Sequence, residues 1–363
     1  MNIDEINEHL ENESAEEENI NTGEEEIQVP PQTFEDQQEE NRWQQNKLDL
    51  HKVSEAADKI KDELGKVIIG QDETIELLLA ALFVGGHVLV EGVPGIAKTL
   101  TANLMAQTIS VDFSRIQFTP DLMPTDVVGT TVYNLKTSEF SFNRGPVFSN
   151  IVLIDEINRA PAKTQAALFE VMEELQVTMD GETHLMEFPF FVVATQNPIE
   201  QEGTYKLPEA QLDRFLFKIN MKYPSLEEEK QILRHFKNDF KIKVRQEVEA
   251  VYSATELRTC QELIEKVFIK EELLDYIAAI IHNTRNNGDL FLGASPRASL
   301  AIMKSSKAIA AMRGRDFVTP DDIQYVAYPV LNHRIILTPE REMEGYDARE
   351  VVNDIIKKIE VPR

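Results

Sequence analysis

The stretch HVLVEGVPGIAKT, residues 87–99, decides the fold of this chain. Its first half is a short apolar run rich in β-branched residues, which predicts a buried parallel strand over 87–92. Its second half fits a phosphate-binding loop that leads into a helix over 99–109. The loop is formed by Gly92, Val93, Pro94, Gly95, Ile96, Ala97, Lys98 and Thr99, and Ala97 stands where the usual pattern has its last glycine.

A loop of this type binds phosphate through its backbone. Glycines let the chain curl so that successive N–H groups point at phosphate oxygens, and the helix that follows presents its positive end. Lys98 is expected to reach the β and γ phosphates of ATP, and Thr99 to hold Mg²⁺ through its hydroxyl. A plain strand-to-helix turn is the alternative, but such a turn does not require a Lys-Thr pair in register with the loop.

Two adjacent carboxylates end a second apolar strand, IVLIDEI at 151–157, and Asp155 lies 57 residues after Lys98. In a P-loop protein, Asp155 is expected to bind Mg²⁺ through water, and Glu156 to orient and deprotonate the attacking water. Asp-Glu pairs are common at strand ends, so the interpretation depends on the P-loop that precedes them.

Three more polar residues are candidates for the same chemistry. Asn197 ends another apolar strand and is expected beside the γ-phosphate, although it could instead cap a turn. Arg214 is a cation that could stabilise charge on transferring phosphoryl oxygens, or it could pair with Asp213. Arg297 lies in the first turn of a predicted helix, where positive charge is unfavourable; this indicates an anionic partner or a surface salt bridge.

The whole chain predicts an α/β fold, with a five-stranded parallel sheet between helices. The other four strands are expected over 113–118, 150–157, 190–197 and 215–221. Helical segments separate most of them, so ligands should bind at the carboxyl ends of the strands. Beyond residue 225 the pattern is helical, over 226–240, 255–267, 270–286, 296–312 and 320–331, which predicts a C-terminal all-helical lid.

These patterns divide the chain into an acidic disordered tail (1–45), an α/β domain (46–225) and a helical lid domain (226–363). Two insertions interrupt the α/β domain. Residues 128–146 alternate polar and apolar side chains around a turn. Residues 176–188 place Asp180-Gly181 between two alternating arms, which is a strong hairpin signal.

Composition restricts the class of protein. The 363 residues carry a formal charge of −26, and residues 1–41 hold 15 of the 63 acids and no Lys or Arg. This acidity disfavours sequence-independent nucleic-acid binding.

Cys260 is the single cysteine, which excludes an intrachain disulfide and a Cys-rich metal site. The longest apolar run, 77–86, is too short to span a bilayer, and the start of the sequence has no secretory signal. We therefore expect a cytoplasmic protein.

Taken together, the motifs resemble those of the MoxR family of AAA+ ATPases over residues 48–340. The matching segments, in chain order, are VIIGQ, GVPGIAKT, RIQFTPDLMPTDVVG, GPVFSNIVLIDEINRAP, the hairpin before FFVVATQNP, EGTYKLPEAQLDRF and GASPRA. The resemblance implies that Lys98 and Thr99 belong to Walker A and that Asp155 and Glu156 form Walker B. Asn197 would be sensor 1, Arg214 the arginine finger and Arg297 sensor 2.

The resemblance also implies an assembly and an output. Such ATPases form rings, with six subunits as the expected number, and Arg214 would act on the neighbouring subunit's nucleotide. The output would be chaperone-like: remodelling, maturation or cofactor loading of a partner. A von Willebrand factor A-domain protein is an expected partner, and contact with a membrane would be only through a partner. Residues 67–71 would lie near adenine.

Two other functions remain open at this point. A nucleic-acid motor of the same superfamily would need a basic pore hairpin, yet residues 176–188 contain no Lys or Arg. A nucleotide-gated scaffold that does not hydrolyse ATP would have no need of Glu156 or Arg214. Among the lesser features, Glu170, Glu173 and Glu174 are predicted to form a solvated helix face, with a ring interface as the alternative.

Overall fold

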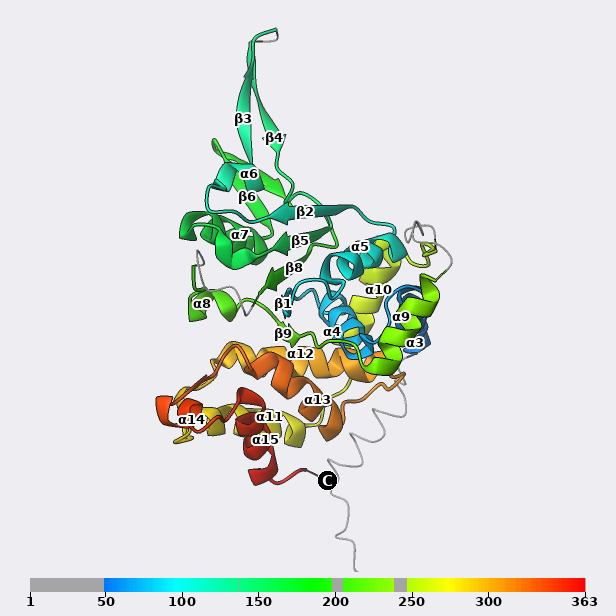
Figure 1. The fold of residues 1–363 in the computed structure, drawn as a ribbon, viewed down its shortest axis with the longest axis vertical. Helices are drawn as coiled ribbons and strands as arrows, with labels where there is room; N and C mark the ends of the chain where they lie inside the picture. Colours follow the sequence, from blue (N-terminus) through cyan, green and yellow to red (C-terminus); the bar gives the residue numbers. More distant parts are fainter. Residues whose placement is uncertain (1–48, 137, 198–204, 238–246, 363) are drawn as a thin grey trace, which may run out of the picture. The chain divides into compact units, whose positions relative to one another are not determined.

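The computed structural model describes residues 49–136, 138–197, 205–237 and 247–362. A five-stranded parallel sheet lies at its centre (Figure 1), with the strand order β2-β5-β8-β1-β9. All five strands were predicted from their apolar runs, and the fold class is confirmed. Their bounds are β1 (Val88–Glu91), β2 (Phe113–Gln117), β5 (Ile151–Asp155), β8 (Phe191–Gln196) and β9 (Phe217–Asn220).

Successive residues of strand β5, which lies between β2 and β8, face two different cores. Ile151 and Leu153 belong to the core shared with the lid, whereas Val152 and Ile154 belong to the core on the other face. This alternation follows from the two-residue period of a strand, and burial on both faces explains why the run is continuously apolar.

The helices of the α/β part are α3 (His51–Gly65), α4 (Asp72–Phe83), α5 (Lys98–Thr108), α6 (Pro124–Val128), η1 (Ile157–Arg159), α7 (Ala162–Glu174) and α8 (Glu209–Leu212).

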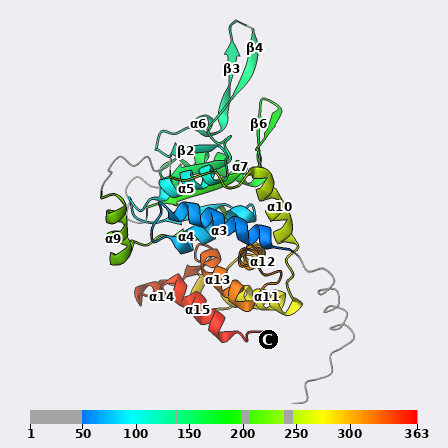
Figure 2. The same ribbon diagram turned by 90° about the vertical axis from the view of Figure 1, so that its right-hand side faces the viewer.

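Both insertions form antiparallel hairpins, which extend from the same end of the α/β part (Figures 1 and 2). The first pairs β3 (Gly129–Asn134) with β4 (Glu139–Arg144), and the second pairs β6 (Gln176–Met179) with β7 (Glu182–Leu185). The second turns at Asp180 and Gly181, with φ of 51° and 85°, as the Asp-Gly pair predicted.

The side chains of the first hairpin divide into exposed and packed sets. Tyr133 and Phe140 lie 5.0 Å apart between ring centroids and are 46% and 73% exposed. Phe142 instead stacks on His184 of the second hairpin at 4.3 Å. Phe142 therefore packs the two hairpins together near their bases.

Over residues 226–237 and 247–362, the C-terminal part is helical apart from a short antiparallel pair, β10 (Leu290–Leu292) and β11 (Ile336–Leu337), and an isolated bridge between Phe268 and Phe317. Helices α12 and α13 span the predicted residues. Ser295 Oγ accepts a hydrogen bond from the N–H of Arg297, Asp322 Oδ2 accepts one from the N–H of Thr319, and a proline begins each helix. The helices are α9 (Leu226–His235), α10 (Ala254–Glu265), α11 (Glu271–Arg285), α12 (Pro296–Met312), α13 (Pro320–Leu331), α14 (Pro339–Met343) and α15 (Ala348–Lys358).

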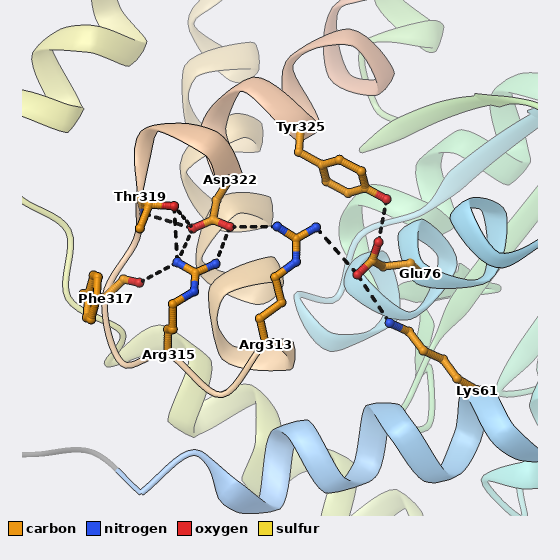
Figure 3. Close-up of polar contacts among 8 residues, drawn as sticks. All are labelled: Lys61, Glu76, Arg313, Arg315, Phe317, Thr319, Asp322 and Tyr325. Atoms are coloured by element: carbon orange, nitrogen blue, oxygen red, sulfur yellow. Dashed lines mark hydrogen bonds and ion pairs between the residues drawn. The ribbon is translucent and has the colours of Figure 1, made fainter. Parts of the chain in front are cut away.

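A polar cluster joins α3 and α4 to the lid helices (Figure 3). Glu76 of α4 accepts hydrogen bonds from Tyr325 Oη at 2.6 Å and Lys61 Nζ at 3.3 Å, and it lies 3.8 Å from Arg313. Asp322, which is fully buried, pairs with Arg315 at 2.6 Å. Buried carboxylates require partners of this kind. Glu76 therefore links α4 to the lid, and Asp322 braces the start of α13 within the lid.

The predicted acidic tail, 1–45, lies outside the described residues. Within the part of the chain that is described, no helix is both long enough and apolar enough to cross a bilayer.

Candidate active site

The P-loop connects β1 to α5 through two residues with left-handed backbone. Gly95 has φ of 87° and Ala97 has φ of 62°. Ala97 therefore occupies a conformation that a glycine adopts at less cost, which explains why glycine is usual there. Gly92 is required for space, because a Cβ atom would lie 2.5 Å from Cδ1 of Ile96 and 3.2 Å from the carbonyl oxygen of Met221.

The cation and hydroxyl of the loop both contact the candidate site. Lys98 Nζ donates to the carbonyl oxygen of Gly92 at 2.7 Å, and Thr99 Oγ1 lies 3.5 Å from Asp155 Oδ2. A hydroxyl and a carboxylate are oxygen ligands of the kind that Mg²⁺ takes with several waters. The donor set at the end of β5 therefore fits this ion.

Asp155 is buried and held by two residues that the sequence did not single out. Thr195 Oγ1 donates to Asp155 Oδ1 at 3.1 Å, and Arg115 Nε donates to Asp155 Oδ2 at 2.6 Å. In the parallel register Arg115 pairs with Leu153, two residues before Asp155, so the side chains of Arg115 and Asp155 lie on the same face of the sheet. The one signal in the sequence was a charged residue in the middle of the predicted strand 113–118.

Glu156 follows Asp155 in left-handed backbone, with φ of 57°. Its N–H donates to Thr195 Oγ1 at 3.1 Å, and its carboxylate accepts from Gln117 Nε2 at 2.7 Å and pairs with Arg159 at 3.0 Å. Left-handed non-glycine residues cluster at functional sites.

Asn197 directly follows β8, which lies between β1 and β5, and it is buried. The carboxyl ends of three neighbouring strands therefore bring together the P-loop, Asp155, Glu156 and Asn197, as the sequence predicted.

Arg214 and Arg297 lie near the amino ends of the strands, opposite the carboxyl ends where the P-loop lies. Leu216 N donates to His87 O at the start of β1, whereas Met221 N donates to Glu91 O at its end, next to the P-loop. Four residues of strand span about 13 Å. Arg214, two residues before Leu216, is therefore remote from its own P-loop.

One carboxylate holds both arginines. Glu173 Oε2 lies 2.7 Å from Arg214 Nη2, and Glu173 Oε1 accepts from Arg297 Nη2 at 2.7 Å. Arg214 Nη1 also donates to the carbonyl oxygen of Phe169 at 2.7 Å. The prediction that Glu173 belongs to a solvated helix face was incomplete, because its partners lie far away in sequence. The suggested pair of Arg214 with Asp213 was wrong, since Asp213 pairs with Arg334 at 2.6 Å.

A cavity of about 100 Å³ lies beside the P-loop, between residues 70–71, the end of β9 and the lid. Gln71 Nε2 donates to Lys222 O at 3.2 Å, and the neighbouring Met221 contacts the loop. The guanidinium of Arg349 lies 4.1 Å from the centroid of the Tyr328 ring in the cavity wall. The segment expected near adenine thus borders a cavity adjacent to the phosphate site.

Comparison with protein families agrees with this geometry. Residues 87–217 match the ATPase family associated with various cellular activities (AAA), and residues 282–355 match the AAA lid domain.

Individual relatives give the finer assignment. The chain is 44% identical to chaperone MoxR1 of Mycobacterium tuberculosis over 83% of this chain and 81% of that protein. It is 46% identical to the uncharacterized protein YeaC of Bacillus subtilis over 86% and 96%, respectively. The crystal structure of a proposed ATPase from Cytophaga hutchinsonii matches with a TM-score of 0.79 and 43% identity, over 86% of this chain and 98% of that one. The chain belongs to the MoxR family of AAA+ ATPases.

Proposed function

We propose that the protein hydrolyses ATP in a homo-oligomeric ring, with each active site completed by the neighbouring subunit. The observation that carries this proposal is the position of Arg214. Walker A, Walker B and Asn197 meet at the carboxyl edge of the sheet, but Arg214 lies at the amino edge, about 13 Å of strand away. An arginine that contacts phosphate from there would have to reach the nucleotide of another chain.

Nucleotide binding rests on the P-loop and the cavity beside it. Backbone N–H groups of residues 92–99 and Nζ of Lys98 would hold the phosphates of ATP. The base would enter the cavity bordered by Gln71 and Tyr328. Lys98 would have to exchange its contact with Gly92 O for phosphate oxygens.

Thr99 and Asp155 would hold Mg²⁺ together with water and phosphate oxygens. The bound ion would supply charge neutralisation at the β and γ phosphates. Arg115 currently contacts the Asp155 oxygen that faces Thr99, so its guanidinium would have to move or share that oxygen.

Hydrolysis would then depend on a positioned water. Glu156 would accept the proton of the attacking water, and the amide of Asn197 would fix the position of that water. Arg214 from the neighbouring subunit would stabilise the charge on the transferring phosphoryl group. Arg297 lies on the same carboxylate as Arg214 and would act with it.

The output we propose is remodelling, maturation or cofactor loading of a partner protein, and the name of chaperone MoxR1 supports it. A von Willebrand factor A-domain protein is the expected partner, and six is the expected number of subunits. The exposed Tyr133 and Phe140 on the first hairpin provide an apolar surface for a client.

A subunit-mixing experiment tests the shared site. Glu156→Gln subunits should bind ATP without turnover, and Arg214→Ala subunits should also be inactive. Mixing the two should restore turnover, because a Glu156→Gln subunit supplies its arginine to an intact neighbouring site. Arg341→Ala, which removes a lid arginine remote from the P-loop, is the control and should remain active alone. No recovery in mixtures shown to co-assemble would contradict the proposal.

A further inference from the structure

Both oxygens of the Glu173 carboxylate are occupied by guanidinium groups. One arginine, Arg214, comes from the α/β part, and the other, Arg297, comes from the first turn of α12 in the lid. Each contact is 2.7 Å long, which is typical of charge-assisted hydrogen bonds. Glu173 therefore bridges two elements as well as two charges.

A third guanidinium lies close to this bridge. Arg334 lies near the same place, and its guanidinium pairs with Asp213. Burial lowers the pKa of Arg334, the pair with Asp213 opposes that shift, and the charge of Arg297 lowers it further. Glu209 lines the same pocket as Asp213 and Arg334, so three carboxylates lie among three guanidinium groups. A phosphate that binds Arg214 and Arg297 would therefore have to replace Glu173 rather than join it.

We propose that Glu173 is a built-in competitor for the γ-phosphate of the neighbouring subunit. Its carboxylate occupies the two arginines while no neighbouring nucleotide is present, and the phosphate displaces it when an ATP-bound subunit docks. This inference rests on the proposed action of Arg214 between subunits. Its consequence is that Glu173 raises the threshold for assembly, so rings form only when the neighbouring site holds ATP.

The chemistry of the groups supports this exchange. Carboxylate and phosphate present oxygens that match the same guanidinium donors, and a γ-phosphate carries more charge than one carboxylate. The cluster is also accessible, since the side chains of Glu173 and Arg297 are 37% and 52% exposed. Partly exposed ion pairs are weak enough to be replaced.

The experiment measures assembly without turnover. In a Glu156→Gln background with Mg²⁺ and ATP, the molecular mass is followed by light scattering against protein concentration. Adding Glu173→Gln keeps the shape of the side chain but removes its charge. It should lower the concentration at half assembly by about three- to tenfold, because two competing ion pairs are weakened. Glu174→Gln, one residue further along, is the matched control and should leave the midpoint unchanged.

Other results would overturn the inference. An unchanged midpoint would show that Glu173 does not compete, and a higher midpoint would show that it only positions the arginines. Arg214→Ala separates this failure from that of the proposed function. If Arg214→Ala subunits alone hydrolyse ATP at the normal rate, the shared site itself is wrong. If they are inactive while Glu173→Gln has no effect, only the competitor role is wrong.

Discussion

Arg334 Nε donates to Asp213 Oδ1 at 2.6 Å, and Arg334 is 3% exposed at its side chain. The same guanidinium donates through Nη2 to the carbonyl oxygens of Asp213 and Phe215 at 3.0 and 2.6 Å. Ser295 Oγ, at the start of α12, also donates to Asp213 at 2.8 Å. Asp213, which precedes Arg214 in the chain, therefore binds two residues of the lid, Arg334 and Ser295. A displacement of the lid would consequently move the backbone that carries Arg214.

Arg334→Ala should destabilise the protein by about 3–5 kcal/mol, because it leaves Asp213 and several carbonyl oxygens without their charged donor. Arg334→Lys should recover only part of this loss, since one ammonium cannot reproduce the planar set of donors. Urea unfolding measures both. Arg341→Ala removes a far more exposed ion pair of the lid and should cost much less. Equal losses for Arg334→Ala and Arg341→Ala would contradict the anchoring role.

Stability should fall on acidification because His87 is buried in its neutral form. Its Nδ1 faces the N–H of Val192 at 3.1 Å, and its Nε2 lies 3.3 Å from Met172 O. Burial lowers the pKa of His87 to about 4, and the contact with Met172 O opposes this shift only in part. The unfolded chain takes up the proton near pH 6.5, so stability is complete above that pH and declines towards pH 4.

At pH 5 the loss from His87 alone should be about 2 kcal/mol relative to pH 8. Urea unfolding at several pH values gives the slope. Burial also lowers the pKa of His333 well below its usual range, so this residue adds to the same trend. His87→Gln should flatten the slope, whereas His282→Gln, at an exposed position of α11, should not. A slope that His87→Gln leaves unchanged would show that the residue is not buried in its neutral form.

Ala97→Gly should stabilise the apo protein by about 0.5 kcal/mol. A left-handed alanine costs about 1–2 kcal/mol, and the greater freedom of glycine in the unfolded chain offsets part of the gain. Ala278→Gly, at an exposed position within α11, should instead cost about 1 kcal/mol. Thermal or urea unfolding of both variants checks the prediction. Loss of stability at both positions would mean that the backbone at Ala97 is not strained.

The strands and the P-loop could be predicted because each depends on a short run of sequence. A strand that is buried on both faces, such as β5, is apolar at every position and can be seen as a continuous run. In the loop, Gly92 is needed because a Cβ atom there would clash with its neighbours. Helices α12 and α13 were predicted to the residue, since their caps and prolines are local signals.

Contacts between distant segments could not be predicted in the same way. Arg115 reaches Asp155 only because β2 pairs with β5 in one particular register. Glu173 meets Arg214 and Arg297 only after the lid has packed on the α/β part. A charged residue on a helix surface gives no sign of such partners, so its solvated state was the natural expectation.

The central claim is that the active site is completed between subunits, and one measurement tests it most directly. ATP hydrolysis is recorded against protein concentration, with the mass of the same samples determined by light scattering. We predict that specific activity rises with concentration in parallel with the oligomer mass, because Arg214 then reaches a neighbouring nucleotide. Full specific activity in a persistent monomer would contradict the account and leave a self-contained P-loop ATPase.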